Sequence, residues 1–287
     1  MIGFLIRKNF YDLWDNMFRI ILLNLGFIVS LAIPIFLPKY IPSTAFSIVM
    51  FAAGLFWCCI YLSASALSVK AVSDYGSFGF ADFWANLKAG WKPGVIMGIL
   101  ALVIVPIIPG TPNVPAAQEA AEAIQEGSVS LIPLIQYIIM FYLNMSSIVG
   151  LLLAAVIFWT FLIAFISLQF FFAIRARLDT KPIKIIKKCF IIFFDNPAFA
   201  VFVLLHTIVT LVLSTLFAFL IPGPAGILLF FDEALRLRLM KYDWLEANPE
   251  TEPGKKRRQI PWDAILIDER EKTGTRSFKS FIFPWKD

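Results

Sequence analysis

Long apolar stretches alternate with shorter polar segments along this chain. A helix that crosses the roughly 30 Å hydrocarbon core of a bilayer needs about 20 predominantly apolar residues. Four stretches meet this requirement, at residues 17–37, 43–67, 93–109 and 197–221. The pattern therefore predicts an all-α membrane protein with at least four transmembrane helices.

Two further stretches have more than one interpretation. Residues 131–174 form an uncharged run that is too long for one span and short for two spans with a turn between them. Residues 223–242 begin apolar, but their second half carries charged side chains, including Asp232 and Arg236. Hydropathy alone leaves the number of crossings open.

The positions of the basic residues favour one topology. Lys and Arg concentrate in short cytoplasmic segments of membrane proteins. If each ambiguous stretch crosses once, all of the 25 Lys and Arg residues except Lys39 lie on one side. The loop at residues 110–130 contains acidic residues and no basic ones, which fits the opposite side. We therefore expect a polytopic bundle of about six transmembrane helices, with both termini in the cytoplasm.

Three segments that precede a span are amphipathic. Apolar side chains recur at helical spacing over residues 6–17, 80–91 and 186–193, with polar residues opposite. We expect each segment to be an interfacial helix that turns into the following span. Two interpretations stay open: a threefold repeat of in-plane helix, ascending span and descending span, or the aromatic belt that forms wherever a cytoplasmic segment enters a bilayer.

The composition changes abruptly after Tyr242. We expect a transmembrane domain at residues 1–245 and a cytoplasmic tail at residues 246–287, which is too short to bury a core of its own. Its last residues, 277–285, either dock on the membrane domain, bind a partner or stay disordered. The tail also contains a basic cluster that we expect to contact anionic lipid head groups, namely Lys255, Lys256, Arg257 and Arg258.

Composition excludes several classes of protein. Of the 287 residues, 59% are hydrophobic and 16% are charged, against about 45–50% and about 25% in soluble domains. One His and 3 Cys provide neither a multi-histidine zinc site nor a disulfide framework. No phosphate-binding loop, HExxH or GxSxG motif is present. We expect no cofactor, no metal and no enzymatic activity, and no nucleic-acid partner because no binding fold accompanies the basic cluster.

Ionisable residues inside apolar stretches are the remaining candidates for a site, since such groups face a partner or a path. Counting 1.5 Å of rise per residue places His206 and Asp232 at a similar depth, where they could form a midplane pair. Glu233 and Asn24 are further candidates for a transport path. The alternative is structural: Asp232 pairs with Arg236, the last helix lies toward the cytoplasm, and His206 bonds a neighbouring helix.

Four motifs carry a resemblance to a known family. They are Pro-Ser-Thr-Ala at residues 42–45, Phe-Trp-Ala-Asn-Leu-Lys at 83–88, Phe-Phe-Phe-Ala-Ile-Arg-Ala-Arg-Leu at 170–178 leading to Lys187, Lys188 and Asn196, and Gly-Pro at 223–224. In these motifs the chain resembles the YesL-like family of bacterial membrane proteins of unknown function. The resemblance implies a multi-pass protein of the bacterial inner membrane with an accessory role beside carbohydrate uptake systems. The longer outer loop and the tail depart from the family pattern.

These observations lead to one functional hypothesis and two alternatives. The first is a non-enzymatic accessory or scaffold in the lipid bilayer, with a membrane protein partner such as an ABC-transport component. The second is a transporter or channel whose path includes His206 and Asp232. The third and weakest is an intramembrane enzyme, which would need a polar cavity that the sequence does not reveal.

Overall fold

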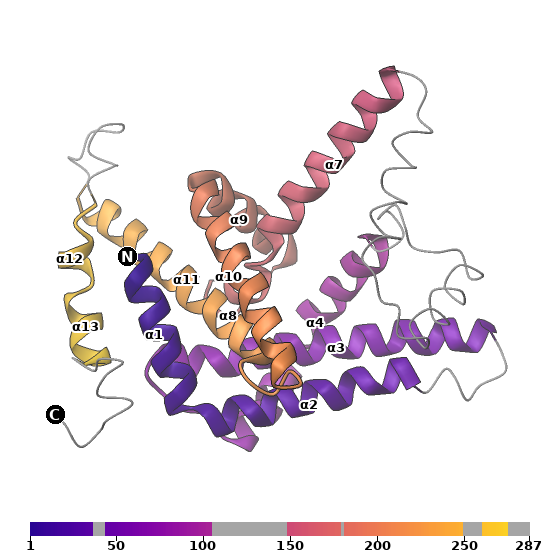
Figure 1. Ribbon diagram of the computed structural model, residues 1–287, viewed down its shortest axis with the longest axis horizontal. Helices are drawn as coiled ribbons and strands as arrows, with labels where there is room; N and C mark the ends of the chain where they lie inside the picture. Colours follow the sequence, from indigo (N-terminus) through magenta and orange to yellow (C-terminus); the bar gives the residue numbers. More distant parts are fainter. Residues whose placement is uncertain (37–43, 105–147, 179–180, 249–259, 275–287) are drawn as a thin grey trace.

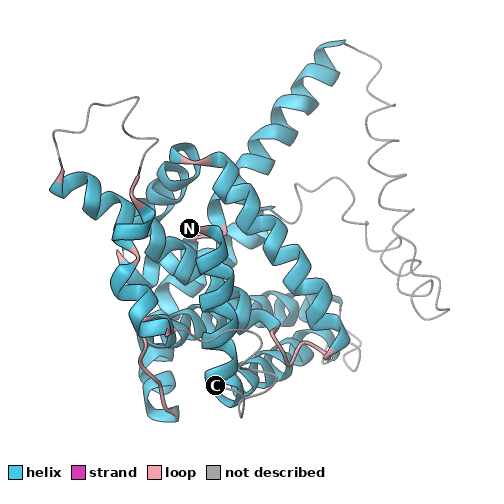
Figure 2. Ribbon diagram, turned by 60° about the vertical axis from the view of Figure 1, so that its left-hand side comes forward, coloured by secondary structure: helices cyan, strands magenta, loops and turns pink. Residues whose placement is uncertain are grey.

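The computed structural model describes residues 1–36, 44–104, 148–178, 181–248 and 260–274. These residues form helices joined by short loops, with no strand among them (Figure 2). The all-α prediction is therefore confirmed for this part of the chain. The helices are α1 (Ile2–Asp15), α2 (Met17–Phe36), α3 (Thr44–Ser73), α4 (Phe80–Ile104), α7 (Ile148–Leu168), α8 (Phe171–Arg177), α9 (Pro182–Asp195), α10 (Pro197–Leu216), α11 (Gly223–Ala247), α12 (Trp262–Ile265) and α13 (Ile267–Thr273).

Among the residues that the structure describes, four helical stretches are long and apolar enough to cross a membrane. They are Met17–Phe36, Val49–Ser73, Ala155–Arg177 and Pro197–Leu216. Three of them match spans expected from the sequence, and the fourth lies in the second half of residues 131–174. The first part of that run, residues 131–147, lies outside the described residues. These four stretches are consistent with a membrane protein, whereas the six crossings remain a prediction.

Two predicted corners between an amphipathic helix and a span are present. α1 and α9 have 14 residues each, and each is followed after one asparagine by a helix of 20 residues. Asn16 donates to the Asp12 carbonyl (3.2 Å), whereas the Asn196 side chain accepts from the Phe199 N–H (3.0 Å) and so caps α10. The α1–α2 and α9–α10 pairs therefore share their helix lengths and an asparagine at the corner.

The third predicted corner, at residues 90–93, is wrong. α4 continues without interruption from Phe80 to Ile104, with Pro93 inside it. A proline removes one backbone hydrogen bond from a helix interior. Packing of α4 along α3 compensates for this loss, because three glycines in this stretch allow close contact between the helices. A separate in-plane helix over residues 80–91 therefore does not form, and the threefold repeat loses its middle unit.

Glycines bring α4 into close contact with α3. Gly90, Gly94 and Gly98 follow one another at intervals of four, which places them on one face of α4. A Cβ atom added at Gly94 would lie 2.4 Å from the Ile60 Cα, and one added at Gly98 would lie 2.4 Å from the Phe56 ring. Such spacing of small residues is typical of tightly packed membrane helices.

The described part of the tail belongs to the same packed unit. Leu266, between α12 and α13, is fully buried in the hydrophobic core that also contains Phe170, Phe171 and Leu235. Figure 1 shows α12 and α13 beside the N-terminal helix α1. Residues 260–274 therefore dock on the rest of the protein. The predicted docking segment, residues 277–285, and the basic cluster Lys255–Arg258 lie outside the described residues.

Candidate functional site

Charged side chains from four helices and from the turn after α3 meet at the C-terminal end of α3. The last turn of a helix leaves its carbonyl groups without intrahelical partners. The Ser73 carbonyl accepts from the Lys8 ammonium group of α1 (3.1 Å) and from the Arg236 guanidinium group of α11. We call the group of residues gathered here the α3-end cluster; it comprises Lys8, Ser73, Asp74, Tyr75, Arg177, Asp232, Arg236 and Glu269.

Arg177 is the most connected member of the α3-end cluster. Its guanidinium group makes a two-pronged ion pair with Asp232, in which Nε lies 2.9 Å from Oδ1. It also donates to Asp74 Oδ1 (3.0 Å) and Ser73 Oγ (2.9 Å). Asp232 is 1% exposed. Because a buried carboxylate needs a charged partner, this pair fixes α8 against α11.

Tyr75 and Arg236 attach α13 to the same cluster. Tyr75 lies just after α3 with a left-handed backbone (φ 61°), and its hydroxyl donates to Glu269 Oε2 (2.9 Å). Burial raises the pKa of the Tyr75 phenol, so the group is a hydrogen-bond donor at physiological pH. Arg236 binds Asp74 (2.9 Å) and Glu269 (2.8 Å). The tail is thereby held by charge-assisted hydrogen bonds.

Glu233 lies beside this cluster in a different environment. It is 1% exposed, and neither carboxylate oxygen has a hydrogen-bond partner among the described residues. The nearest cation is Lys8, whose Nζ lies 3.8 Å from Glu233 Oε1 and also pairs with Asp12. Lys8 further lies 4.2 Å from the centre of the Tyr75 ring. The Lys8 ammonium group therefore lies close to two carboxylates, those of Asp12 and Glu233.

His206 and Asp232 are not brought together. The His206 ring stacks on Phe230, with 3.6 Å between ring centres and 14° between planes, and its Nδ1 lies 3.3 Å from Thr210 Oγ1. Asp232 instead binds Arg177. The alternative pairing of Asp232 with Arg236 is also absent among the described contacts, since Arg236 binds Asp74 and Glu269.

His206 and Asp232 lie at a similar height in the bundle but do not meet. The His206 ring stacks on Phe230, which lies two residues before Asp232 in α11. Side chains two positions apart in a helix lie on different faces, so Asp232 faces the end of α3 instead of His206. α11 begins inside the bundle, where Gly223 lies against Asn24 of α2.

Asn24 has a structural role at the loop between α10 and α11. Its amide group donates to the carbonyls of Leu220 (2.9 Å) and Pro222 (2.8 Å), and its oxygen accepts from the Ala225 N–H (2.8 Å). It is fully buried. Two of these bonds satisfy backbone groups that α11 itself leaves unpaired, the Leu220 carbonyl and the Ala225 N–H, whereas the Pro222 carbonyl also accepts from the Gly226 N–H. Asn24 therefore fixes the loop from inside the bundle.

We expect Asn24→Ala to lower the free energy of unfolding by about 2 kcal/mol, because it leaves buried backbone groups without partners. Thermal unfolding in detergent, followed with a thiol-reactive fluorophore, measures this change, since all three cysteines are buried. Ser30→Ala is the matched control: this buried α2 hydroxyl bonds within its own helix, to the Gly26 carbonyl, and accepts from Trp57. An effect no larger than that of the control would contradict the assigned role.

A second set of contacts closes the corner between α9, α10 and α11. Lys241 pairs with Asp195, and the Arg238 guanidinium lies 4.0 Å from the centre of the Phe199 ring. Burial raises the pKa of Asp195, but the hydrogen bond and charge of Lys241 lower it by more, so the net pKa lies below the ordinary value. Burial raises the pKa of the Cys189 thiol to about 12. Cys189 is therefore a packing residue rather than a nucleophile.

Cavities within the bundle are apolar. One of about 510 Å³ and another of about 380 Å³ share Met97, Leu168, Gln169 and Phe231 as lining residues, and their walls are mainly aliphatic and aromatic. The part of the chain that the structure describes contains no group of three His, Cys, Asp or Glu side chains placed to hold a metal ion. No charged side chain among the described residues lines either cavity.

Comparison of the chain with protein-family models, with curated proteins and with solved structures finds no match. The resemblance to the YesL-like family therefore stays a prediction.

Sequence reasoning missed the most connected members of the α3-end cluster, Arg177, Asp74 and Tyr75. Arg177 and Asp232 are 55 positions apart, so no local spacing indicates the pair. The three α4 glycines were also missed, although their regular spacing was a usable signal.

Proposed function

We propose that this protein is a non-enzymatic accessory or scaffold of the bacterial inner membrane. The observation that carries the proposal is what the polar candidate residues contact. Three of the four candidates for a transport path, Asp232, Asn24 and His206, have partners that hold helices together. The fourth, Glu233, is buried and faces the Lys8 ammonium group. Side chains that are fixed in ion pairs and backbone contacts support a rigid structure rather than a path for a solute.

The proposed topology has six crossings and both termini in the cytoplasm. The four apolar helical stretches would be joined by α4 with the segment that follows it, and α11 would return the chain to the cytoplasmic side from a start inside the bundle, beside Asn24 of α2. The contact between Arg7 of α1 and the Gly274 carbonyl at the end of α13 supports termini on one side. A link to carbohydrate uptake, with an ABC-transport component as partner, rests on the family resemblance.

An exposed aromatic pair at the start of α4 is the proposed contact surface. Phe80 and Trp84 are 84% and 53% exposed, and their rings stack with 6.5 Å between centres. The pair lies in the first two turns of α4, just after the loop that follows α3. Trp is among the residues that most often contribute strongly to protein interfaces. A partner protein would cover this apolar surface.

Affinity isolation from native membranes in mild detergent, with mass spectrometry of bound proteins, tests the proposal. We expect a near-stoichiometric membrane protein partner with the full chain, and its loss when Phe80 and Trp84 are both replaced by Ser. Phe18→Ser is the matched control, because Phe18 is an aromatic residue 78% exposed on α2. Recovery of the isolated chain alone would contradict the proposal, and flux into proteoliposomes with the His206→Leu variant would then test transport.

A further inference from the structure

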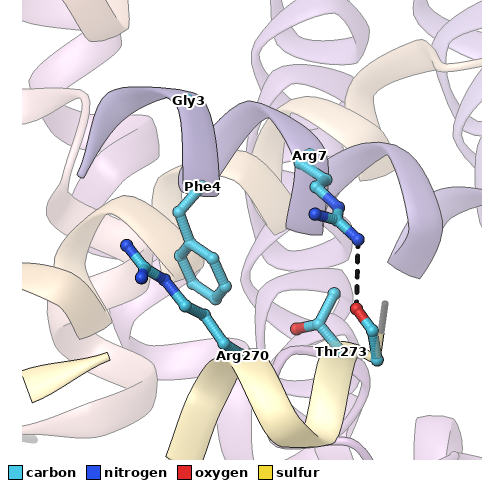
Figure 3. A pocket seen from close by; sticks show the side chains of 6 residues that line it. Gly3, Phe4, Arg7, Arg270 and Thr273 are labelled. Atoms are coloured by element: carbon cyan, nitrogen blue, oxygen red, sulfur yellow. Dashed lines mark hydrogen bonds between the residues drawn. The ribbon is translucent and has the colours of Figure 1, made fainter. Parts of the chain in front are cut away.

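A cavity of about 490 Å³ lies between α1 and α13, away from the apolar cavities of the bundle. Figure 3 shows Gly3, Phe4 and Arg7 of α1 on one side, and Arg270 and Thr273 of α13 on the other. Its volume is within the range of small-molecule sites, about 300–1,000 Å³. The N-terminal helix and the described part of the tail thus line one pocket.

The pocket is positively charged. Arg7 and Arg270 lie on either side of the Phe4 ring (Figure 3), and none of the described residues that line the pocket is acidic. Arg270 pairs with Asp263 (2.7 Å), but Asp263 is an exposed partner, with a side chain 92% exposed. An exposed pair of this kind contributes little energy. Arg270 can therefore exchange this partner for another anion at small cost.

Glycines keep the walls of the pocket open. A Cβ atom added at Gly3 or at Gly274 would meet no atom within 4 Å. A ligand can therefore approach the backbone at both positions. Gly274 ends α13 with a left-handed backbone (φ 76°), a conformation that favours glycine, and its carbonyl accepts from Arg7 Nη2 (3.0 Å).

The surroundings of the pocket indicate which kind of anion it would meet. Ile2 and Ile6, one turn apart on α1, are 42% and 41% exposed. They are sequence neighbours of the lining residues Gly3 and Arg7, so an apolar stripe runs along the edge of the pocket. An amphipathic helix with such a stripe rests in the interfacial region of a bilayer. There the nearest anions are lipid phosphates.

We propose that the pocket between α1 and α13 binds the phosphate group of an anionic phospholipid, with Arg7 and Arg270 as ligands. Guanidinium groups match phosphate oxygens with paired N–H donors. The Phe4 ring and the Ile2–Ile6 stripe would face the glycerol and the first acyl carbons. The same chemistry suits a soluble phosphate ester, and the experiment separates the two sources. The site does not depend on the proposed function.

Native mass spectrometry of the full chain in neutral detergent provides the measurement. The probes are phosphatidylglycerol, phosphatidylcholine and free glycerol phosphate, each titrated separately. We expect one phosphatidylglycerol molecule to bind at least about tenfold more tightly than phosphatidylcholine, since the choline cation of phosphatidylcholine cancels the charge of its phosphate and is repelled by the two arginines. Equal binding of glycerol phosphate would support the site but assign it to a soluble phosphate ester.

Two variants test the location of the site. Arg270→Gln removes one ligand and should weaken phosphatidylglycerol binding about tenfold. Gly3→Leu fills the open space beside Gly3 and should block binding without breaking a contact in the protein. Arg19→Gln is the control, because this exposed arginine lies outside the pocket and donates to Asn16. The proposal is overturned if no probe binds preferentially, or if both pocket variants bind phosphatidylglycerol as the unmodified chain and the control do.

Discussion

Replacing Arg177 with Met lowers the free energy of unfolding by about 3–5 kcal/mol, the range found when one partner of a buried ion pair is removed. The substitution keeps most of the side-chain volume but leaves Asp232, which is 1% exposed, without its cation. It also removes hydrogen bonds to Asp74 and to the Ser73 hydroxyl. Thermal unfolding in detergent with a thiol-reactive fluorophore measures the loss.

Two controls separate the ion pair from a general effect of lost charge. Arg19→Met removes an exposed arginine whose described hydrogen bond is to Asn16, and we expect a change below about 0.5 kcal/mol. In the double variant Arg177→Met/Asp232→Leu, the buried carboxylate is removed as well, so much of the stability should return. If the double variant loses as much free energy of unfolding as the two single variants added together, the ion pair is not the source of the effect.

The helices that the sequence predicted best are those with a local signal. α2, α3 and α10 are apolar runs longer than 18 residues, and such runs are unambiguous because a bilayer demands them. α1 and α9 combine an apolar and a polar face with an asparagine at the corner. In both cases the information lies within one or two turns of helix.

The α3-end cluster could not be predicted in the same way. Its members come from α1, α3, α8, α11 and α13, and they meet only after these helices have packed. Asp232 is closer in sequence to Arg236 than to Arg177, yet the position of α8 decides its partner. Proximity in sequence therefore favoured the wrong ion pair. The His206 ring likewise stacks on an α11 side chain, Phe230, that no spacing rule selects.

The error at residues 90–93 has another physical origin. A residue before a proline is common at a helix boundary. The prediction followed this pattern at Pro93 rather than the regular spacing of the nearby glycines. The contact with α3 extends over this segment, from Gly90 beside Ser63 to Gly98 beside Phe56. Close packing along such a surface stabilises a continuous helix across a proline. Interhelical contact thus overrides the local preference for a break.

Replacing Gly94 with Leu lowers the free energy of unfolding by about 3 kcal/mol or more, because it overpacks the contact between α3 and α4. An added Cβ atom already lies 2.4 Å from the Ile60 Cα and 2.8 Å from the Ile60 backbone nitrogen. These are backbone atoms, which cannot rotate away as the end of a side chain can. The helices must separate, and they lose contacts along their length.

A graded series in detergent unfolding checks this explanation. Gly90→Ala should cost less than Gly94→Ala, since the nearest atom to the new Cβ is the Ser63 hydroxyl at 3.0 Å, which can turn away. Gly3→Ala is the matched control, because its Cβ meets nothing within 4 Å and alanine favours helix by about 1 kcal/mol over glycine. If Gly3→Ala and Gly94→Ala lower the free energy of unfolding equally, glycine is required at neither position for helix contact. This result would contradict the close packing of α3 and α4.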